Sequence, residues 1–340
     1  SNQANWDSGD GTPGDDGYPD DSNDTALIDS SGDAIGTPGS ALAIGGLTLT
    51  NGFTGTLTLN ASLTLDDGTG ASGAFIGSGF TGTLAAGSND VLVDGTVTFG
   101  SAMTLSGTGT WYLSGDRPQT LTSNGINAYE IRVISPGGVD LVDDLSVTNR
   151  LYVGAEESGI TAVLRSNDHR IDIGDDLIIG LSGFPSAYGI LYANASQVVV
   201  GDDLRFHVPT AADGNQIVFT TGSFSVGDDF DIKGTGCLFD AGSSTTTLTV
   251  VDDAATLLSN GITFHHLVIN DADGGGTLAL LDALDVDGDL TITSGTLDSA
   301  GFPITCAGDW SNSDAFTAAT GTVTLDGAAL QTVTSGSSAW

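Results

Sequence analysis

A nine-residue pattern that returns along the chain constrains the fold more than any other feature of the sequence. Residues 198–206 read Val-Val-Val-Gly-Asp-Asp-Leu-Arg-Phe, and the same spacing returns at 171–179 and 224–232. In each copy two alternating stretches flank a three-residue corner, so that the apolar residues on both sides of the corner face the same way. Looser copies surround residues 141–145, 286–290 and 306–310. Such recurrence is typical of a coiled, repetitive β architecture.

The spacing of the corners indicates the length of one coil. The residues that directly follow the corners are Leu63, Val97, Leu145, Leu177, Leu204, Phe230, Leu290 and Trp310. Their intervals are 34, 48, 32, 27, 26, 60 and 20 residues, and we interpret 48 and 60 as two coils each. Coils of roughly 20–34 residues match the rungs of a parallel β-helix. We therefore predict an all-β fold, a single-stranded parallel β-helix (β-solenoid) of about ten coils.

A longer repeat overlays the short one, with partial copies at 109–135, 245–270 and 321–340. The segment from Gly109 to Ser123 returns 212 residues later, and Ser123-Asn124-Gly125-Ile126 returns as Ser259-Asn260-Gly261-Ile262. The third copy stops at Trp340, either because the chain was cut there or because something else completes the open end. We predict an acidic, Gly/Pro-rich N-terminal segment at 1–24 and a parallel β-helix over 25–340.

Charge excludes several classes of partner. The chain has 43 acidic residues against seven basic ones, a formal charge of −36. Such a surface repels phosphate backbones and anionic lipid headgroups, so we expect no nucleic-acid partner. No apolar run approaches the roughly 20 residues of a membrane span, so we do not expect a membrane-spanning protein. Of the two cysteines, Cys306 takes an inward position and is expected to be buried, while a disulfide with Cys237 stays open.

The corner aspartates are the candidate metal ligands. An Asp directly precedes the returning apolar residue in all six copies, and Asp176, Asp203 and Asp229 belong to the three strongest. Stacked carboxylates repel each other, and Ca²⁺ bridging them is one interpretation. The other is that each Asp accepts hydrogen bonds from backbone N–H groups of its own turn. Further candidate Ca²⁺ ligands lie in the N-terminal segment, at Asp7, Asp10, Asp15 and Asp16, although the EF-hand spacing is absent.

Catalysis is not expected. Six similar corners differ from an active site, which needs one distinctive constellation. A β-helix enzyme that cuts acidic polysaccharides would need clustered cationic groups, whereas the arginines are scattered from Arg117 to Arg205. The His265-His266 pair suggests a metal, but adjacent strand residues face opposite sides, so we interpret it as an ordinary strand pair.

Several segments resemble β-helical passenger or repeat regions of very large secreted bacterial surface proteins of the autotransporter or haemagglutinin-adhesin kind. These are Asn5-Trp6, Pro19, residues 24–29, the strands around Leu47 and Leu57, Gly308–Trp310 and Gly321–Gln331. The resemblance implies a surface-exposed, right-handed β-helix used for adhesion or as a stalk, and it implies no catalytic residues.

We therefore expect an extracellular structural protein, a subunit or segment of a surface fibre or stalk that assembles with itself through end-to-end β-helix contacts. The alternative is an adhesin segment that binds a glycan or a surface receptor. The two differ in outcome, because the fibre forms without any ligand whereas an adhesin monomer shows saturable binding.

Overall fold

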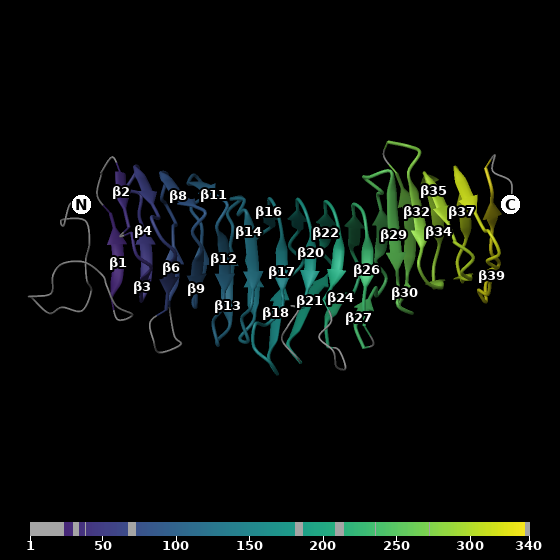
Figure 1. The fold of residues 1–340 in the computed structure, drawn as a ribbon, viewed down its shortest axis with the longest axis horizontal. Coiled ribbons are helices and arrows are strands. Elements are labelled where there is room, and N and C mark those ends of the chain that lie inside the picture. Colours follow the sequence, from purple (N-terminus) through teal and green to yellow (C-terminus); the bar gives the residue numbers. More distant parts are fainter. Residues whose placement is uncertain are drawn as a thin grey trace, which may run out of the picture. The chain divides into compact units, whose positions relative to one another are not determined.

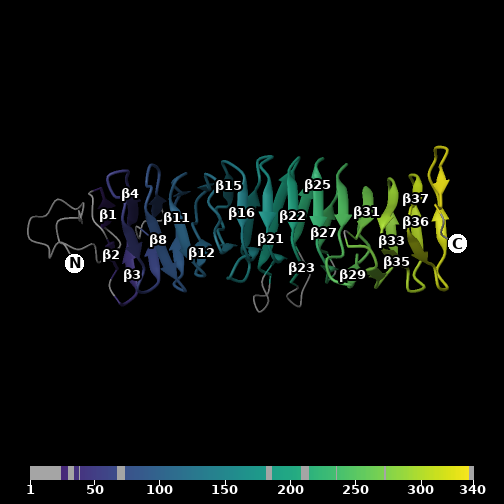
Figure 2. The same ribbon diagram turned by 90° about the horizontal axis from the view of Figure 1, so that it is seen from above.

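Short parallel strands joined by tight corners make up the described part of the chain. The computed structural model describes residues 24–29, 34–37, 39–66, 73–180, 186–207, 214–234, 236–271 and 273–336, and over these it contains strands and turns but no helix. The chain forms two compact units. Unit 1 holds Ser1–Ala155 with Ile160–Arg165, and unit 2 holds Glu156–Gly159 with Ser166–Trp340. Figures 1 and 2 show the strands of each unit as successive rungs.

In unit 1 the chain passes through three parallel sheets in turn. The first contains β1 (Thr25–Ile28), β4 (Gly46–Leu49), β7 (Ala74–Ile76), β10 (Val97–Thr98), β13 (Gln119–Thr122), β15 (Val139–Leu141) and β18 (Thr161–Arg165). The second contains β2 (Ala34–Gly36), β5 (Thr56–Thr58), β8 (Thr83–Gly87) and β11 (Thr104–Gly107). The third contains β3 (Leu42–Ile44), β6 (Leu63–Leu65), β9 (Val91–Val93), β12 (Thr110–Leu113), β14 (Glu130–Val133) and β17 (Leu151–Val153). In addition, β16 (Leu145–Val147) bridges Ala128.

Unit 2 repeats the arrangement. One sheet contains β19 (Ile171–Ile173), β22 (Gln197–Val200), β25 (Ser223–Val226), β28 (Thr245–Leu248), β31 (His266–Asn270), β34 (Leu290–Ser294), β37 (Trp310–Asn312) and β40 (Val333–Thr334). The next contains β20 (Leu177–Ile179), β23 (Leu204–Phe206), β26 (Phe230–Ile232), β29 (Ala254–Leu258), β32 (Thr277–Leu280), β35 (Thr296–Asp298) and β38 (Ala315–Thr317). Strands β21 (Tyr188–Asn194), β24 (Gln216–Phe219) and β27 (Leu238–Asp240) are the last three of the ten-stranded sheet that begins with β1. A four-stranded sheet contains β30 (Thr263–Phe264), β33 (Leu284–Val286), β36 (Ile304–Cys306) and β39 (Val323–Leu325).

The predicted β-solenoid is confirmed, with about 13 turns rather than about ten. The difference arises because some turns lack the Gly-Asp-Asp corner by which the coils are recognised in the sequence. One such corner is Ser123-Asn124-Gly125, where Asn124 and Gly125 adopt φ values of 51° and 78°. No helix in the described residues is long and apolar enough to cross a membrane.

The core consists of side chains that alternate inward along each strand and stack in register from turn to turn. In unit 1, Trp111 pairs with Val91 on one side and Ile131 on the other, and all three are buried. The Trp111 ring also meets Phe75 and Phe99 edge-on, at centroid distances of 5.2 and 4.9 Å. Each fully buried Leu, Ile, Val or Phe contributes about 1.5–3 kcal/mol relative to leaving it exposed, so these stacks hold successive turns together.

The first and third copies of the long repeat make the same side-chain contacts. Gln119 Oε1 accepts a bond from Gly115 N (2.9 Å), while its amide donates to Val93 O (3.0 Å) and Gly95 O (2.7 Å). In the third copy Gln331 accepts from Gly327 N (3.0 Å) and donates to Cys306 O (2.9 Å) and Gly308 O (2.6 Å). The repeat therefore encodes one corner structure, in which a glutamine amide ties its turn to the preceding one.

Candidate metal site

Three Gly-Asp-Asp corners stack on successive turns of unit 2. They lead into β20, β23 and β26, and their backbones are bonded from turn to turn: Asp202 N donates to Asp175 O (3.1 Å) and Asp228 N to Asp202 O (2.9 Å). The stacking requires glycine at the first position. A Cβ on Gly201 would lie 2.4 Å from the Gly174 carbonyl oxygen, and one on Gly227 would lie 2.0 Å from that of Gly201.

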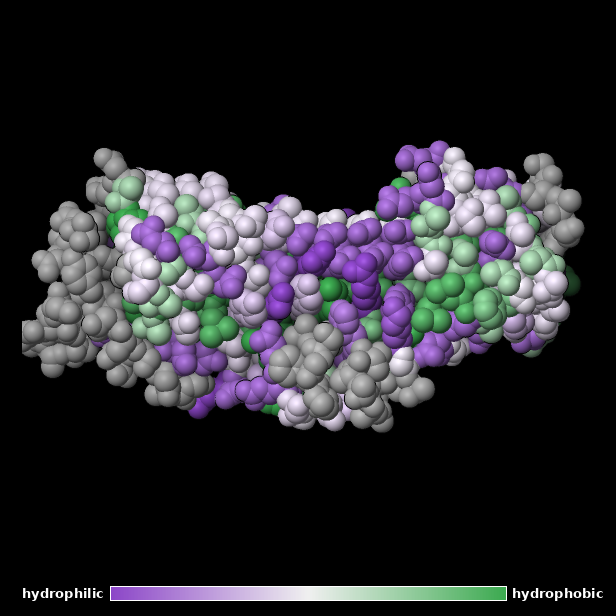
Figure 3. Space-filling view, viewed as in Figure 1, coloured by the Kyte–Doolittle hydropathy of each residue, from purple (hydrophilic) through white to green (hydrophobic). Residues whose placement is uncertain are grey.

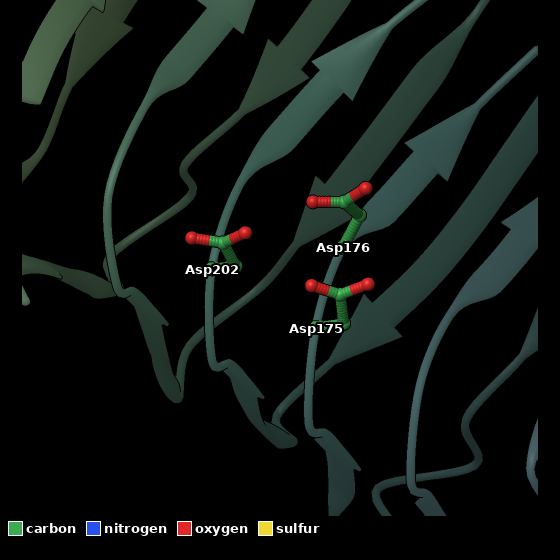
Figure 4. A group of neighbouring side chains, drawn as sticks. All are labelled: Asp175, Asp176 and Asp202. Carbon is green, nitrogen blue, oxygen red and sulfur yellow. The ribbon is translucent and has the colours of Figure 1, made fainter.

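Stacking brings carboxylates of neighbouring turns together, as Figure 4 shows for Asp175, Asp176 and Asp202. Their ligand oxygens lie within 4.8 Å of one another, and the same holds for Asp202, Asp203 and Asp228. We call these five residues the corner cluster. Asp176 and Asp203 are buried, with 1% and 4% of their surface exposed. Figure 3 shows hydrophilic residues gathered over the region of β20 to β26 on the face in view.

Burial and mutual repulsion raise the pKa of three carboxylates of the corner cluster, Asp202, Asp203 and Asp228. Desolvation, followed by the charges of Asp203, Asp176 and Asp175, raises the pKa of Asp202 to about 6. Desolvation and the neighbouring charges of Asp229 and Asp203 raise the pKa of Asp228 to about 6 as well. Two of the carboxylates therefore titrate just below neutral pH, a behaviour that a bound cation would abolish by favouring the charged form.

One cation already lies in the cluster. Arg205, on β23, places Nη1 3.1 Å from Asp176 Oδ2 and also contacts Asp203 through Nη2. Arg205 lowers the pKa of Asp203, but burial outweighs it, so that the pKa of Asp203 is still raised. The arginine forms ion pairs with Asp176 and Asp203. Asp228 Oδ1, by contrast, is a buried carboxylate oxygen without a hydrogen-bond partner. Asp228 therefore offers an unpaired oxygen to a further cation, beside Asp202 and Asp203.

The predicted metal residues fall into three groups. Asp176 and Asp203 lie in the corner cluster, whereas Asp229 caps the next turn: its Oδ1 accepts the N–H and the hydroxyl of Thr256, both at 2.7 Å. Asp7, Asp10, Asp15 and Asp16 lie outside the described residues. Sequence reasoning missed Asp175, Asp202 and Asp228, the first aspartates of the three corners. The doubling of Asp at each corner is the signal that marks them.

Several corner aspartates do accept backbone hydrogen bonds, but not from their own turn as predicted. Asp203 Oδ1 accepts from Asp229 N (2.8 Å), and Asp289 Oδ1 from Asp309 N (2.8 Å), each one turn later in the chain. Asp309 Oδ1 in turn accepts from Thr332 N (2.7 Å). These aspartates therefore tie consecutive turns together.

The two cysteines and the His265-His266 pair are the remaining candidates from the sequence. Cys306 is buried as expected, and Cys237 and Cys306 are not joined in a disulfide. The expectation that His265 and His266 face opposite sides is wrong, because their ring centroids lie 4.3 Å apart. His265 falls between β30 and β31, where the strand alternation is broken, and His266 Nδ1 accepts a bond from Asp289 N (2.9 Å).

No family model matches the chain, and no curated protein or solved structure matches it either.

Proposed function

We propose that the chain is a structural β-solenoid, a subunit or segment of an extracellular fibre or stalk. The observation that carries the proposal is the regularity of its contacts. In the described residues, the same ties between turns recur at one corner after another: an Asp carboxylate to the next corner's N–H, and a Gln amide to the preceding turn's carbonyls. Repeated use of one contact stabilises length, whereas an active site differs from its surroundings.

End-to-end assembly is part of the proposal, and the last described turn supports it. Strands β38, β39 and β40 are each the final strand of their sheets. Leu325, Leu330 and Val333 are exposed on this turn, Leu330 by 96%. Strand edges with apolar side chains beside them are templates for pairing with another chain. The proposed occupant is a second copy of the protein, whose first turn would continue the three sheets.

The test is negative-stain electron microscopy of the purified chain and of two matched variants. Leu330→Lys places a charge on the last described turn, whereas Leu281→Lys places the same charge on a side chain that is 48% exposed, directly after β32. We expect filaments from the parent chain and from Leu281→Lys, and isolated particles from Leu330→Lys. Filaments of normal length from Leu330→Lys would show that the contact does not use this turn.

Ca²⁺ is the cation that the proposal assigns to the corner cluster, with Asp202 and Asp228 among its carboxylate ligands. Hard cations prefer several carboxylate and carbonyl oxygens, which stacked corners provide. Ca²⁺ should raise the thermal midpoint of the parent chain more than Mg²⁺ at the same concentration, and Asp202→Asn should remove the difference. An equal response of the two ions, or an unchanged response in Asp202→Asn, would remove Ca²⁺ from the proposal without affecting the fibre.

A second candidate, an adhesin segment that binds a glycan, is favoured by one outward ladder of unit 1. Tyr112, Arg132 and Tyr152 stack on β12, β14 and β17, with the guanidinium 5.5 and 4.4 Å from the two ring centroids. Aromatic and guanidinium groups side by side offer both apolar surface and hydrogen-bond donors. Saturable binding on a glycan panel, lost in Tyr152→Ala, would favour the adhesin, while a panel without binding would favour the fibre.

A further inference from the structure

The dipeptide Asn-Gly occurs at three turns of the described structure. The three pairs are Asn51-Gly52, Asn124-Gly125 and Asn260-Gly261. Each pair occupies the centre of a turn in which the fourth residue donates to the carbonyl of the first, at 3.2, 3.0 and 3.2 Å. All three asparagines are exposed, and each glycine N–H donates to the Thr or Ser hydroxyl two residues before it, at 3.3, 3.1 and 3.3 Å. Sequence, exposure and turn closure therefore do not distinguish the three sites.

The conformation of the asparagine does distinguish them, since two of the turns hold it in the left-handed region. Asn124 and Asn260 have φ values of 51° and 52°, and the glycines that follow have 78° and 79°, as a type I′ turn requires. Each side-chain amide donates to a carbonyl of the preceding turn, Phe99 O for Asn124 (2.6 Å) and Gly234 O for Asn260. Both asparagines are therefore held at the backbone and at the side chain.

Asn51 has neither restraint. It and Gly52 lie outside the left-handed region, which with the same closing bond makes the turn type I instead of type I′. Its side chain makes no hydrogen bond to any residue that the structure describes. Gly79 of the following turn lies beside it and has no side chain to offer, since a Cβ there would lie 3.6 Å from Asn51 Cβ. The side chain of Asn51 is therefore free to rotate.

We propose that Asn51 is a site of spontaneous covalent modification and converts to isoaspartate, while Asn124 and Asn260 remain intact. The nitrogen of Gly52 bonds to Cγ of Asn51, the Cγ–Nδ2 bond breaks, and the amide nitrogen leaves as ammonia with the proton of the attacking N–H. Water then opens the succinimide ring at one of its two carbonyls and leaves isoaspartate or aspartate, so solvent is the only co-reactant. Glycine favours the attack because it has no Cβ to crowd the nitrogen.

The turn type sets how far each asparagine is from ring closure. Closure requires the Cβ of the asparagine to eclipse the following nitrogen. From a right-handed turn this takes about a quarter turn about ψ, whereas from a left-handed turn it takes roughly a half turn. At Asn124 and Asn260 closure must also break the bond between the side-chain amide and its carbonyl. Both requirements raise the barrier at these two sites and leave it lower at Asn51.

Conversion at Asn51 affects the core of unit 1. Isoaspartate adds a methylene group to the backbone and a carboxylate to the surface, two residues before Phe53. Phe53 is fully buried, and its ring stacks on Phe80 of the following turn with a centroid distance of 5.4 Å and an angle of 3°. A longer turn displaces this ring, so conversion should lower the stability of the unit. The inference does not depend on the fibre proposal, because it concerns a single chain.

Peptide mapping by mass spectrometry measures the conversion at each site. The full chain would be kept at pH 8.5 and 37 °C, either folded in buffer or unfolded in guanidinium chloride, and isoaspartate would be located by electron-transfer fragmentation. In the folded chain we expect Asn51 to convert at least about tenfold faster than Asn124 or Asn260, since those two must break a further hydrogen bond and rotate further. In guanidinium chloride the three rates should become similar, because the turns are lost.

Two variants separate the turn from the sequence. Asp143→Ala removes the carboxylate that accepts the backbone N–H of Asn124 (2.6 Å), so conversion at Asn124 should rise, while Asn260 keeps its own carboxylate partner and should not change. Asn51→Ser cannot form the ring, so its thermal midpoint should stay constant during the incubation while that of the parent falls. Equal conversion at the three sites of the folded chain, the same advantage of Asn51 in guanidinium chloride, or no rise at Asn124 in Asp143→Ala would each overturn the proposal.

Discussion

At the scale of single residues, what matters for a buried polar group is whether the neighbouring turn offers it a partner. Ser123 and Ser259 are buried, and their hydroxyls donate to Asp144 O (2.5 Å) and Ala283 O (3.0 Å) in the following turn. Thr246, on β28, is fully buried between Ser223–Val226 and His266–Asn270, and its hydroxyl has no partner. A buried hydroxyl without a hydrogen bond costs free energy that a methyl group would not.

Replacing this hydroxyl should stabilise unit 2. Thr246→Val keeps the shape and the β-branched stem and removes the unpaired oxygen, so we expect the free energy of unfolding to rise by about 1 kcal/mol. Urea denaturation followed by circular dichroism measures the change. Thr247→Val, on the outward face of the same strand, is the control and should lie within about 0.5 kcal/mol of the parent. A loss of stability in Thr246→Val would mean that the hydroxyl is satisfied in solution.

The corner cluster predicts a pH dependence with a definite sign. Asp202 and Asp228 have folded-state pKa values of about 6, above the ordinary 3.8, so the folded chain holds their protons more tightly than the unfolded chain. The stability they contribute is complete below about pH 4 and is lost as pH rises through 6. In calcium-free buffer the thermal midpoint of unit 2 should therefore fall from pH 4.5 to 7.5.

The double variant Asp202→Asn/Asp228→Asn isolates this effect from the general repulsion among acidic residues. At pH 7.5 it should have a higher thermal midpoint than the parent, and its thermal midpoint should change less with pH. The control variant Asp326→Asn should show the same pH dependence as the parent. An unchanged slope in the double variant would assign the pH dependence to the overall charge instead.

At the scale of elements, the sequence predicts the strand–corner–strand unit well because its chemistry is local. Alternation sets which side chains face inward, and Gly-Asp-Asp sets the corner, so 171–179, 198–206 and 224–232 form strand pairs as predicted. The partners of the corner side chains could not be predicted in the same way. They depend on which turn lies alongside, and single-sequence patterns give no distance between turns. For this reason the sequence predicts neither that Asp202 lies beside Asp228 nor that Arg205 contacts Asp176 and Asp203.

The long repeat allows a test of how burial changes the contribution of one glutamine side chain to the free energy of unfolding. Gln119 is 2% exposed and makes three hydrogen bonds to backbone groups, whereas Gln331 makes the same three in the last described turn and is less buried. Gln119→Leu leaves those groups unpaired in the interior and should cost about 2–4 kcal/mol. Gln331→Leu should cost less than half as much, because water can reach the same groups. Chemical denaturation of both variants measures the difference. Equal losses in the free energy of unfolding would show that burial does not determine how much the glutamine hydrogen bonds contribute.

At the scale of the whole molecule, charge and apolar contact oppose each other. A chain with a formal charge of −36 repels its copies over a Debye length of about 10 Å at 0.1 M salt and about 3 Å at 1 M. The proposed contact through Leu325, Leu330 and Val333 is apolar and is not screened. Sodium chloride should therefore strengthen end-to-end association, the opposite of what it does to a contact made of ion pairs.

Sedimentation velocity at 0.05, 0.15 and 0.5 M NaCl measures this dependence. We expect the weight-average sedimentation coefficient to rise with salt in the parent chain and in Leu281→Lys, and to stay at the monomer value in Leu330→Lys. A CaCl₂ series at matched ionic strength separates screening from specific binding. If Ca²⁺ raises the sedimentation coefficient more than NaCl does, and Asp202→Asn abolishes the difference, the effect comes from the corner cluster. Association that weakens as NaCl rises would show that the contact between copies is ionic. It would then lie away from the apolar last described turn, and the proposed end-to-end contact would be wrong.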